Sequence, residues 1–373
     1  MTREQLVQDV YTCASCGFCR FGCPVYDVVG FERVTVRGRM LIFKKILEGR
    51  MEYTDGVTDS IYMCAGCGNC TVECPTGIDF VEMARTLRED LVRRGQLPES
   101  QRPIRGTLVL KSNPFGEPLE ERGAWVPPQY QEPKKSANLY FAGCTASYSL
   151  NRVAKSILKI LEDIGYDFTI LGSRERCCGN PLFRMGEREA AREMMDENCE
   201  RFDELGVEHI FTSCAGCLTT FTHDYPQKYR VRHVTQLLDE LVKEGRLQFD
   251  KELNEKLIYF DGCDIGRHCG IYEEPRRVLR AIPGVELIEF DYNREEAMCC
   301  GGPLMSSYPN VATHIASMRM REAEEKGAGM VVTACPACFI NLKGGAKEAG
   351  VKASIQDIAL LLPRLVKKEK GPS

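Results

Sequence analysis

Residues 144–217 and 263–338 both read C-x(32–35)-C-C-G-x(33–34)-C-x-x-C, so one cysteine pattern occurs twice in the chain. The first cysteine set is Cys144, Cys177, Cys178, Cys214 and Cys217, and the second cysteine set is Cys263, Cys299, Cys300, Cys335 and Cys338. Four ligands complete a tetrahedral zinc site, so a fifth thiolate would be surplus. Two matched sets of soft thiolates therefore predict two iron–sulfur centres, one in each copy.

The segments that lead to these cysteines alternate between short apolar strands and amphipathic helices. The predicted strands cover residues 139–142, 168–171 and 209–212 in the first copy and 257–260, 286–290 and 330–333 in the second. Strands that alternate with helices predict mostly parallel sheets, and sites in such sheets lie at the carboxyl ends of the strands. We therefore expect two related α/β repeats whose cysteine sets meet at one cavity between them.

Two further cysteine runs near the N-terminus share the spacing C-x2-C-x2-C-x3-C-P. This spacing is typical of bacterial ferredoxins, in which the fourth cysteine ligates the other cluster. One 4Fe–4S cubane is therefore assigned to Cys13, Cys16, Cys19 and Cys74, and the second to Cys64, Cys67, Cys70 and Cys23. A pair of zinc knuckles is the alternative, and two identical four-cysteine runs followed by proline fit clusters better.

The predicted fold class is α+α/β, with an N-terminal α-helical ferredoxin domain followed by two cysteine-rich α/β repeats related by a pseudo-twofold axis. Helices are expected at 1–12, at 39–48 and after Asp79, where Glu82 stands at capping-box spacing. The predicted divisions are a ferredoxin domain at 1–97, a connector at 98–136, and repeats at 137–250 and 251–373. Seven prolines lead us to expect no long regular element in the connector, and its apolar residues, Trp125 among them, predict that it lies across the next domain.

Composition narrows the classes of function that the chain can have. Its 373 residues contain 20 cysteines, and 18 of these fall into the four motifs, which favours metal ligation over a disulfide framework. No secretory signal and no apolar run of about 18 residues is visible. We therefore expect a cytoplasmic protein that reaches a membrane only through a partner subunit. The net charge of −4 predicts no nucleic-acid partner.

These residues resemble the cysteine-rich iron–sulfur oxidoreductases, a family that includes components of heterodisulfide reductase, glycolate oxidase and anaerobic glycerol-3-phosphate dehydrogenase. Arg37-Gly38-Arg39 is similar to the glycolate oxidase type, whereas residues 113–118 (NPFGEP) with Trp125 resemble the D-type component of heterodisulfide reductase. The resemblance implies that each complete cysteine set holds a noncubane 4Fe–4S cluster. It also implies that a disulfide bound between the two clusters receives one electron from each side.

One departure from the family pattern lies beside a predicted ligand of the second set. Many members read D-P-C-H-L-G-R where this chain reads D-G-C-D-I-G-R at residues 261–267, so Asp264 replaces the usual histidine. This replacement puts the usual substrate contacts in doubt. Arg184, Arg267 and His268 are the candidates to line the cavity mouth and hold anionic groups, with ordinary surface charge as the alternative.

The expected function is that of an oxidoreductase subunit of the disulfide reductase type, active within a complex, in which the ten cysteines of the two sets carry disulfide or thiol chemistry. The alternative is an electron relay between a flavin dehydrogenase subunit and a quinone-linked membrane partner. A non-redox zinc scaffold is the third and weakest hypothesis. No G-x-G-x-x-G after a strand and no Walker loop is present, so we expect any flavin or nucleotide on a partner.

Three smaller features complete the predictions. A partner flavoprotein, or a membrane cytochrome, could dock on the basic stretch 33–50, although a solvated helix face is an equal alternative. Its cations are Arg37, Arg39, Lys44, Lys45 and Arg50. Cys199 and Cys269 lie outside the motifs, and we interpret both as structural thiols.

Overall fold

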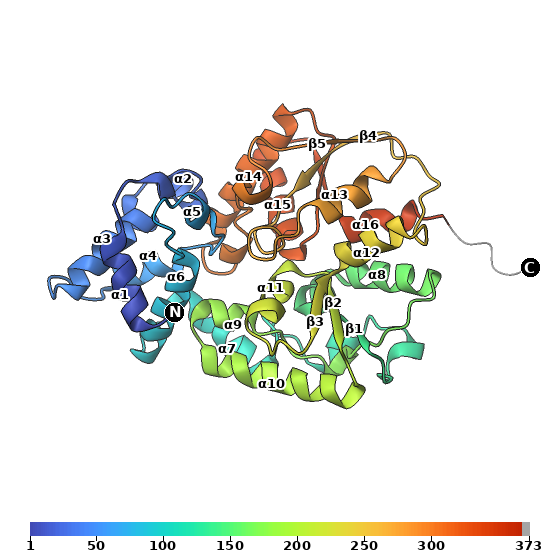
Figure 1. Ribbon diagram of the computed structural model, residues 1–373, viewed down its shortest axis with the longest axis horizontal. Helices are drawn as coiled ribbons and strands as arrows, with labels where there is room; N and C mark the ends of the chain where they lie inside the picture. Colours follow the sequence, from blue (N-terminus) through green and yellow to red (C-terminus); the bar gives the residue numbers. More distant parts are fainter. Residues whose placement is uncertain (368–373) are drawn as a thin grey trace, which may run out of the picture.

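The computed structural model describes residues 1–367 of the chain. Figure 1 shows helices alone in the N-terminal part at one end of the molecule, and two α/β parts side by side at the other. The N-terminal helices are α1 (Arg3–Thr12), α2 (Pro24–Val29), α3 (Val36–Leu47), α4 (Asp55–Tyr62), α5 (Asn69–Val72) and α6 (Phe80–Arg93). Helices α1, α3, α4 and α6 enclose one small core, to which α1 contributes Leu6 and Val10 and α6 contributes Leu87 and Leu91, whereas Val25 of α2 packs in a separate cluster with residues of the second repeat.

Local capping explains where two of these helices begin. The helix predicted at 39–48 starts earlier, at Val36, because the Thr35 hydroxyl accepts a hydrogen bond from the Gly38 amide at 3.1 Å. Asp79 caps α6 as expected and accepts from the amide of Glu82 at 3.2 Å. The Glu82 carboxylate does not return to the cap, however, because it binds the amine of Met1 at 2.9 Å.

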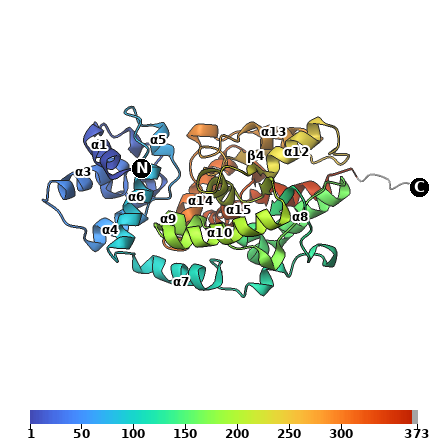
Figure 2. The same ribbon diagram turned by 60° about the horizontal axis from the view of Figure 1, so that its bottom comes forward.

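The connector contains a regular element that the sequence analysis did not expect. Helix α7 (Arg102–Lys111) runs along the outside of the molecule, as Figure 2 shows, and buries Leu108. Pro103 lies in its first turn, where the missing amide has no helical partner to lose, so the proline starts this helix instead of excluding it. Trp125 is buried in the core of the following repeats, as predicted.

The first repeat is built on three parallel strands in the order β1-β2-β3. The strands are β1 (Asn138–Phe141), β2 (His209–Thr212) and β3 (Arg230–His233), and the helices are α8 (Asn151–Asp163), α9 (Asn180–Met185), α10 (Arg188–Leu205), α11 (Ala215–His223) and α12 (Val234–Lys243). In register, Asn138 pairs with His209 and His209 with Arg230. All three strands therefore end at one edge of the sheet.

The second repeat has four parallel strands in the order β5-β4-β6-β7. The strands are β4 (Glu255–Phe260), β5 (Val285–Ile288), β6 (Met330–Thr333) and β7 (Ser354–Asp357), and the helices are α13 (Glu273–Arg280), α14 (Pro309–Glu325), α15 (Pro336–Ala349) and α16 (Ile358–Leu361). The predicted strand at 286–290 is shifted, since β5 ends at Ile288. The fold class is thus the predicted one, with a helical N-terminal region and a parallel sheet in each repeat.

The sheet edges differ from the predictions. The segment 168–171 is not a full strand, because it forms only one bridge, between Thr169 and Leu139, before the chain turns at Gly172. This bridge occupies the place that β5 has in the second sheet. Strands β3 and β7 were not predicted. Each has only four residues and carries polar side chains, so neither has the apolar run that identified the others.

The N-terminal helices pack closely against the first repeat. The Tyr62 hydroxyl donates to the carbonyl of Met185 at 2.8 Å, and Arg188 pairs with Glu89. Gly186, which ends α9 with φ of +90°, lies so near α6 that an added Cβ would stand 2.4 Å from the Arg88 carbonyl carbon. Only glycine permits this approach, because the obstacle is backbone and cannot rotate away.

We expect Gly186→Ala to lower the thermal unfolding midpoint more than Gly206→Ala does. Both glycines have positive φ, but an added Cβ at Gly206 meets nothing within 4 Å, so this variant measures the backbone strain alone. The overpacking at Gly186 should add roughly 1–3 kcal/mol to that cost. Equal midpoints for the two variants would show that the packing of α6 on α9 is not tight.

The buried carboxyl group of Asp357 predicts a pH-dependent stability. It caps α16 through a 2.9 Å hydrogen bond from the Ala359 amide, and its second oxygen has no partner among the described residues. Burial raises its pKa to about 7. The folded state therefore binds this proton more tightly than the unfolded chain, and the resulting stabilisation is lost as the pH rises from about 4 through 7.

Asp357→Asn keeps the capping oxygen and removes the charge. We expect the variant to raise the thermal midpoint relative to the natural protein at pH 8 and to raise it much less at pH 5. Scanning calorimetry at both pH values measures the difference. A gain of the same size at pH 5 and pH 8 would contradict the expected ionisation.

Candidate metal centres and the cavity between the repeats

The first cysteine set lies at the carboxyl edge of the first sheet. Cys144 follows β1, and Cys214 and Cys217 lie at the start of α11, directly after β2. Cys177 and Cys178 reach the same edge because Gly179 turns the chain with φ of +89°. The thiols contact one another in the order 144–177–178–217–214.

The second cysteine set repeats this arrangement at the carboxyl edge of the second sheet. Its thiols contact one another in the order 263–299–300–338–335, and the Cys300 and Cys338 sulfurs are 3.2 Å apart. Gly301 has φ of +80°, and an added Cβ would stand 2.8 Å from the Ala312 carbonyl oxygen. Five converging soft sulfurs in each set fit an iron–sulfur core and exceed what one zinc ion requires.

Both sets open onto one cavity of about 490 Å³. All five cysteines of the first set line it, together with four of the second. Cys299 is the exception, because its thiol lies against the thiol of Cys67 in the N-terminal part. The expectation that the two sets meet at one cavity is therefore confirmed.

The remaining walls of the cavity come from all parts of the chain. The N-terminal part supplies Tyr62 and Ala65, the connector supplies Ile104 and Phe115, and the second repeat supplies Met305. Its charged side chains among the described residues are Arg88, Arg184 and Asp264. Outside the thiols the lining therefore combines apolar side chains with these charges and with neutral polar groups such as Asn180.

The N-terminal cysteines form two groups that combine both sequence motifs. Cys23 shares a small cavity with Cys64, Cys67 and Cys70. Cys19 has Cys13, Cys16 and Cys74 as its thiol neighbours. This grouping supports the crossed assignment of the fourth cysteines, which stays a prediction.

Arg184, Arg267 and His268 have a role that the sequence did not suggest. Arg184 Nη1 donates to the Ala65 carbonyl at 3.0 Å, and Arg267 Nε donates to the Cys67 carbonyl at 2.7 Å. His268 Nε2 lies 2.9 Å from the Gly66 carbonyl oxygen. These side chains therefore hold the backbone of residues 64–67.

The predicted role of the three residues in holding anionic groups stays a prediction, and the structure shows what these side chains contact within the protein. Arg267 and His268 do not line the cavity. Arg184 does line it, but its guanidinium is already paired with Asp264 at 2.5 Å. Arg88, in the N-terminal part, holds the same loop, because its Nη2 donates to the Cys64 carbonyl at 2.8 Å. The sequence could not show this, because the Arg267 and Cys67 partners lie 200 residues apart.

Arg122, in the connector, is a contact of the first cysteine set that the sequence analysis missed. It is fully buried, and its Nη1 donates to the Cys144 sulfur at 3.2 Å. The same guanidinium pairs with Glu175. Burial opposes the charge of Arg122, but Cys144 and Glu175 outweigh it and hold the Arg122 pKa well above its ordinary value. No motif marks this arginine, because its partners lie 22 and 53 residues away.

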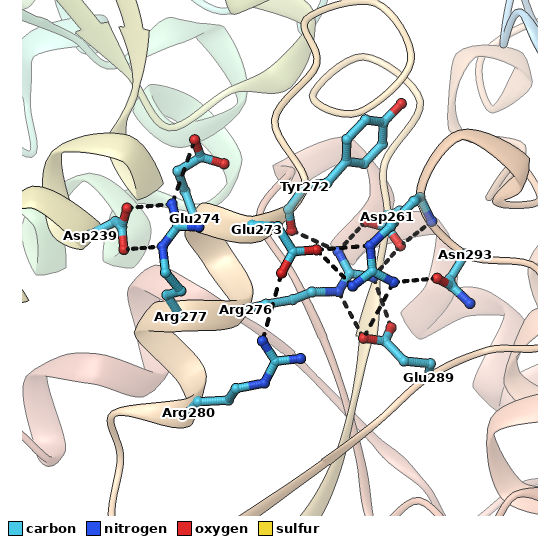
Figure 3. A network of polar contacts seen from close by, with 11 residues as sticks. Asp239, Asp261, Tyr272, Glu273, Glu274, Arg276, Arg277, Arg280, Glu289 and Asn293 are labelled. Carbon is cyan, nitrogen blue, oxygen red and sulfur yellow. Dashed lines mark hydrogen bonds and ion pairs between the residues drawn. The ribbon is translucent and has the colours of Figure 1, made fainter.

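Arg276 is the buried arginine of the second repeat. Figure 3 shows its guanidinium between Asp261 and Glu289, to which it donates at 2.6–2.8 Å. Its other hydrogen bond goes to the Tyr272 carbonyl at 2.7 Å. Arg277, on the same helix, pairs with Asp239 at 2.7 Å and joins the two repeats.

The two cysteines outside the motifs do not line the cavity. Cys199 packs on the core of the first repeat, and Cys269 Sγ lies 3.8 Å from the Thr219 hydroxyl. Burial raises the pKa of Cys269 to about 11. Half-buried, protonated thiols of this kind agree with the structural interpretation, which stays a prediction.

The basic stretch is not a uniform docking face. Arg39 is buried and donates to the Ser60 carbonyl at 2.7 Å, so it supports the fold of the N-terminal part. Arg37 pairs with Glu32, and Lys45 with Glu48. Lys44 lies over the ring of Tyr11. Only the outer side of α3 is left as the proposed docking face for a partner.

The chain matches two families of known domains. Residues 138–222 and 257–343 match the cysteine-rich domain family (CCG), and residues 9–78 match the 4Fe-4S dicluster domain family. Helical cysteine motifs, two α/β repeats and two five-cysteine sets together define the class. The protein belongs to the CCG-domain iron–sulfur oxidoreductases.

Curated relatives agree with this class. The chain is 31% identical to the D-type component of dihydromethanophenazine:CoB–CoM heterodisulfide reductase from Methanosarcina acetivorans, over 97% of this chain and 95% of that one. It is 30% identical to the probable iron-sulfur-binding oxidoreductase FadF of Bacillus subtilis, over 83% of this chain and 47% of that protein. It is 29% identical to EtfAB:quinone oxidoreductase of Syntrophomonas wolfei, over 95% and 58%.

One solved structure shares the fold. A hypothetical protein from Helicobacter pylori aligns with a TM-score of 0.54 at 10% identity, over 88% of this chain and 66% of that chain. Within residues 1–367, no helix combines the length and the apolar character needed to cross a membrane.

The crossed assignment predicts which cluster each variant damages. We expect Cys23→Ser to remove the same electron paramagnetic resonance signal as Cys64→Ser, and a different signal from Cys13→Ser, because Cys23 lies among the second group of thiols. Cys199→Ser, outside both groups, is the control and should leave every signal in place. Loss of the Cys13-dependent signal in Cys23→Ser would refute the crossed arrangement.

Proposed function

We propose that this protein is an iron–sulfur oxidoreductase subunit of the heterodisulfide reductase type, which carries disulfide or thiol chemistry in the cavity between its repeats. The cavity that both complete cysteine sets share is the observation that carries the proposal. The similarity to the D-type component of a heterodisulfide reductase over nearly the whole chain supports it. Noncubane 4Fe–4S clusters on the two sets would supply electrons one at a time.

Reduction of a disulfide consumes two electrons and two protons and releases two thiols, as the sulfur–sulfur bond breaks. In a cavity with one cysteine set on each side, each sulfur of a bound disulfide can lie next to one set. Tyr62, Ile104 and Phe115 add apolar and aromatic surface to the wall of this space. The three residues expected to hold anionic groups contact the protein backbone or Asp264 in this structure.

Electrons would enter through the N-terminal cubanes. Cys67, assigned to one cubane, touches Cys299 of the second set, so the protein offers a short path between the two kinds of centre. Cys16, assigned to the other cubane, is exposed on the surface. A flavoprotein, with a membrane cytochrome as a further candidate, is the class of partner that would deliver or receive electrons there.

An electron relay without substrate chemistry is the second candidate function. The similarity to a protein named EtfAB:quinone oxidoreductase favours it. In that case the protein would pass electrons between a flavin dehydrogenase subunit and a quinone-linked membrane partner. A relay requires the contact of Cys67 with Cys299, but it gives no reason for a cavity that both sets line.

The test begins with the metal content of anaerobically purified protein. We expect about sixteen irons per chain, eight from two cubanes and eight from two noncubane clusters. A count near eight with stoichiometric zinc would remove the proposed clusters and leave the ferredoxin motifs intact.

A disulfide or thiol probe then tests the chemistry. We expect small organic thiols to change the electron paramagnetic resonance spectrum of oxidised protein, and Cys177→Ser or Cys299→Ser to abolish that change. Cys199→Ser should respond like the natural protein. If thiols leave every signal of an iron-replete protein unchanged, disulfide chemistry is excluded and the relay function takes its place.

A further inference from the structure

Among the described residues, Arg122 is the one arginine whose guanidinium donates a hydrogen bond to a sulfur of either five-cysteine set. Its Nη1 lies 3.2 Å from Cys144 Sγ, and both side chains are buried. Glu175 holds the other side of the guanidinium and also accepts from the amides of Ala142 and Gly143 at 3.0 Å. The orientation of Arg122 toward the sulfur is therefore fixed by a rigid partner.

The second repeat contains the matching ion pair but not the matching contact. Asp261 stands two residues before Cys263, where the first repeat has Ala142 two residues before Cys144. Asp261 pairs with Arg276, which is held by a second carboxylate, Glu289 (Figure 3). None of the Arg276 hydrogen bonds in the described part of the chain goes to a sulfur.

Two other cations lie near the second set, and they act differently. Arg184 is neutralised by Asp264 at 2.5 Å. Arg267 has no carboxylate partner in residues 1–367, but its hydrogen bonds go to the carbonyls of Cys67, Glu295 and Ala297. These cations contribute a field around the second set, whereas Arg122 binds one ligand sulfur of the first set directly.

We propose that Arg122 tunes the reduction potential of the iron–sulfur cluster at the first cysteine set through its hydrogen bond to Cys144. The inference rests on the proposed function in one respect, namely that both sets hold clusters. Reduction adds one negative charge to a cluster, and an N–H donor on a ligand sulfur stabilises that charge. Arg122 thus raises the reduction potential of the first cluster. The reduction potential of the second cluster depends on other groups.

The residues present fit this role because the contact is dry and directional. A buried charge-assisted hydrogen bond is stronger than an exposed one, and water cannot replace the donor. Glu175 limits the effect by neutralising part of the positive charge. The two halves of the cavity therefore differ electronically although their cysteines correspond one to one.

The experiment is a redox titration followed by electron paramagnetic resonance on the holoprotein. The matched variants Cys144→Ser and Cys263→Ser first identify which signal belongs to which set. Arg122→Lys keeps a positive charge but shortens the side chain, so we expect the midpoint of the first-set signal to become more negative. The second-set midpoint should stay in place.

Glu175→Gln is the second variant and keeps the size of the buried side chain. It removes a negative charge beside Arg122, so the first-set midpoint should become more positive if the network acts on that cluster. Arg276→Lys is the control, because its guanidinium contacts no sulfur, and it should leave the first-set midpoint unchanged. A specific shift in either Arg122→Lys or Glu175→Gln supports the role.

Unchanged first-set midpoints in both variants, or equal shifts at both sets, would overturn it. Failure of the premise that both sets hold clusters gives a different result, because then the first-set signal itself is absent and the iron count is near eight. The two failures are therefore distinguishable in one preparation.

Discussion

The contacts of three arginines and one histidine with the carbonyl groups of residues 64–67 are the interaction on which the arrangement of the whole protein depends. Arg184, Arg267 and His268 reach this loop from the repeats, and Arg88 reaches it from α6. A buried carbonyl that loses its donor costs free energy, so each of these bonds is costly to lose. They place Cys67 against Cys299 and so join the ferredoxin motifs to the second cysteine set.

The sequence predicted the features that depend on cysteine spacing and on apolar runs. It did not predict side-chain contacts between residues that are far apart in the chain. The two five-cysteine sets, their position at the strand ends and their common cavity all follow from the repeated pattern. Arg267 and His268 looked like substrate ligands because they follow Cys263 closely in the chain. Their partners, the carbonyls of Cys67 and Gly66, are about 200 residues away and leave no trace in the local sequence.

Local chemistry also explains the remaining differences. The basic stretch 33–50 suggested a docking surface, and Arg37-Gly38-Arg39 within it a similarity to the glycolate oxidase type. Gly38 is required by packing, because an added Cβ would stand 2.0 Å from the Glu32 carbonyl oxygen. Arg39 is buried against the Ser60 carbonyl. A motif with this composition therefore serves the packing of α3. Pro103 was expected to exclude a long helix from the connector. It lies in the first turn of α7, where proline favours a helix, whereas a proline in the middle of a helix would break it.

The two repeats retain the same thiols but obtain their buried ion pairs from different places. The first uses Arg122 from the connector with Glu175, and the second uses Arg276 from α13 with Asp261. An arginine supplied by the connector ties the first set to the segment whose Phe115 also walls the cavity. One ordered segment therefore contributes both to the cavity wall and to the surroundings of the first set.

The thiols of the two sets differ in what they face. All five cysteines of the first set face the cavity, whereas Cys299 of the second set faces Cys67 and only its four companions face the cavity. A centre that touches the N-terminal motifs on one side and the cavity on the other is placed to pass electrons inward. The first set faces the same cavity as Cys64 of the N-terminal part, so it also has a cysteine of that part opposite it. Thiols of the N-terminal part and of both repeats therefore converge on one cavity, and this convergence is what the proposed chemistry and the alternative relay would both use.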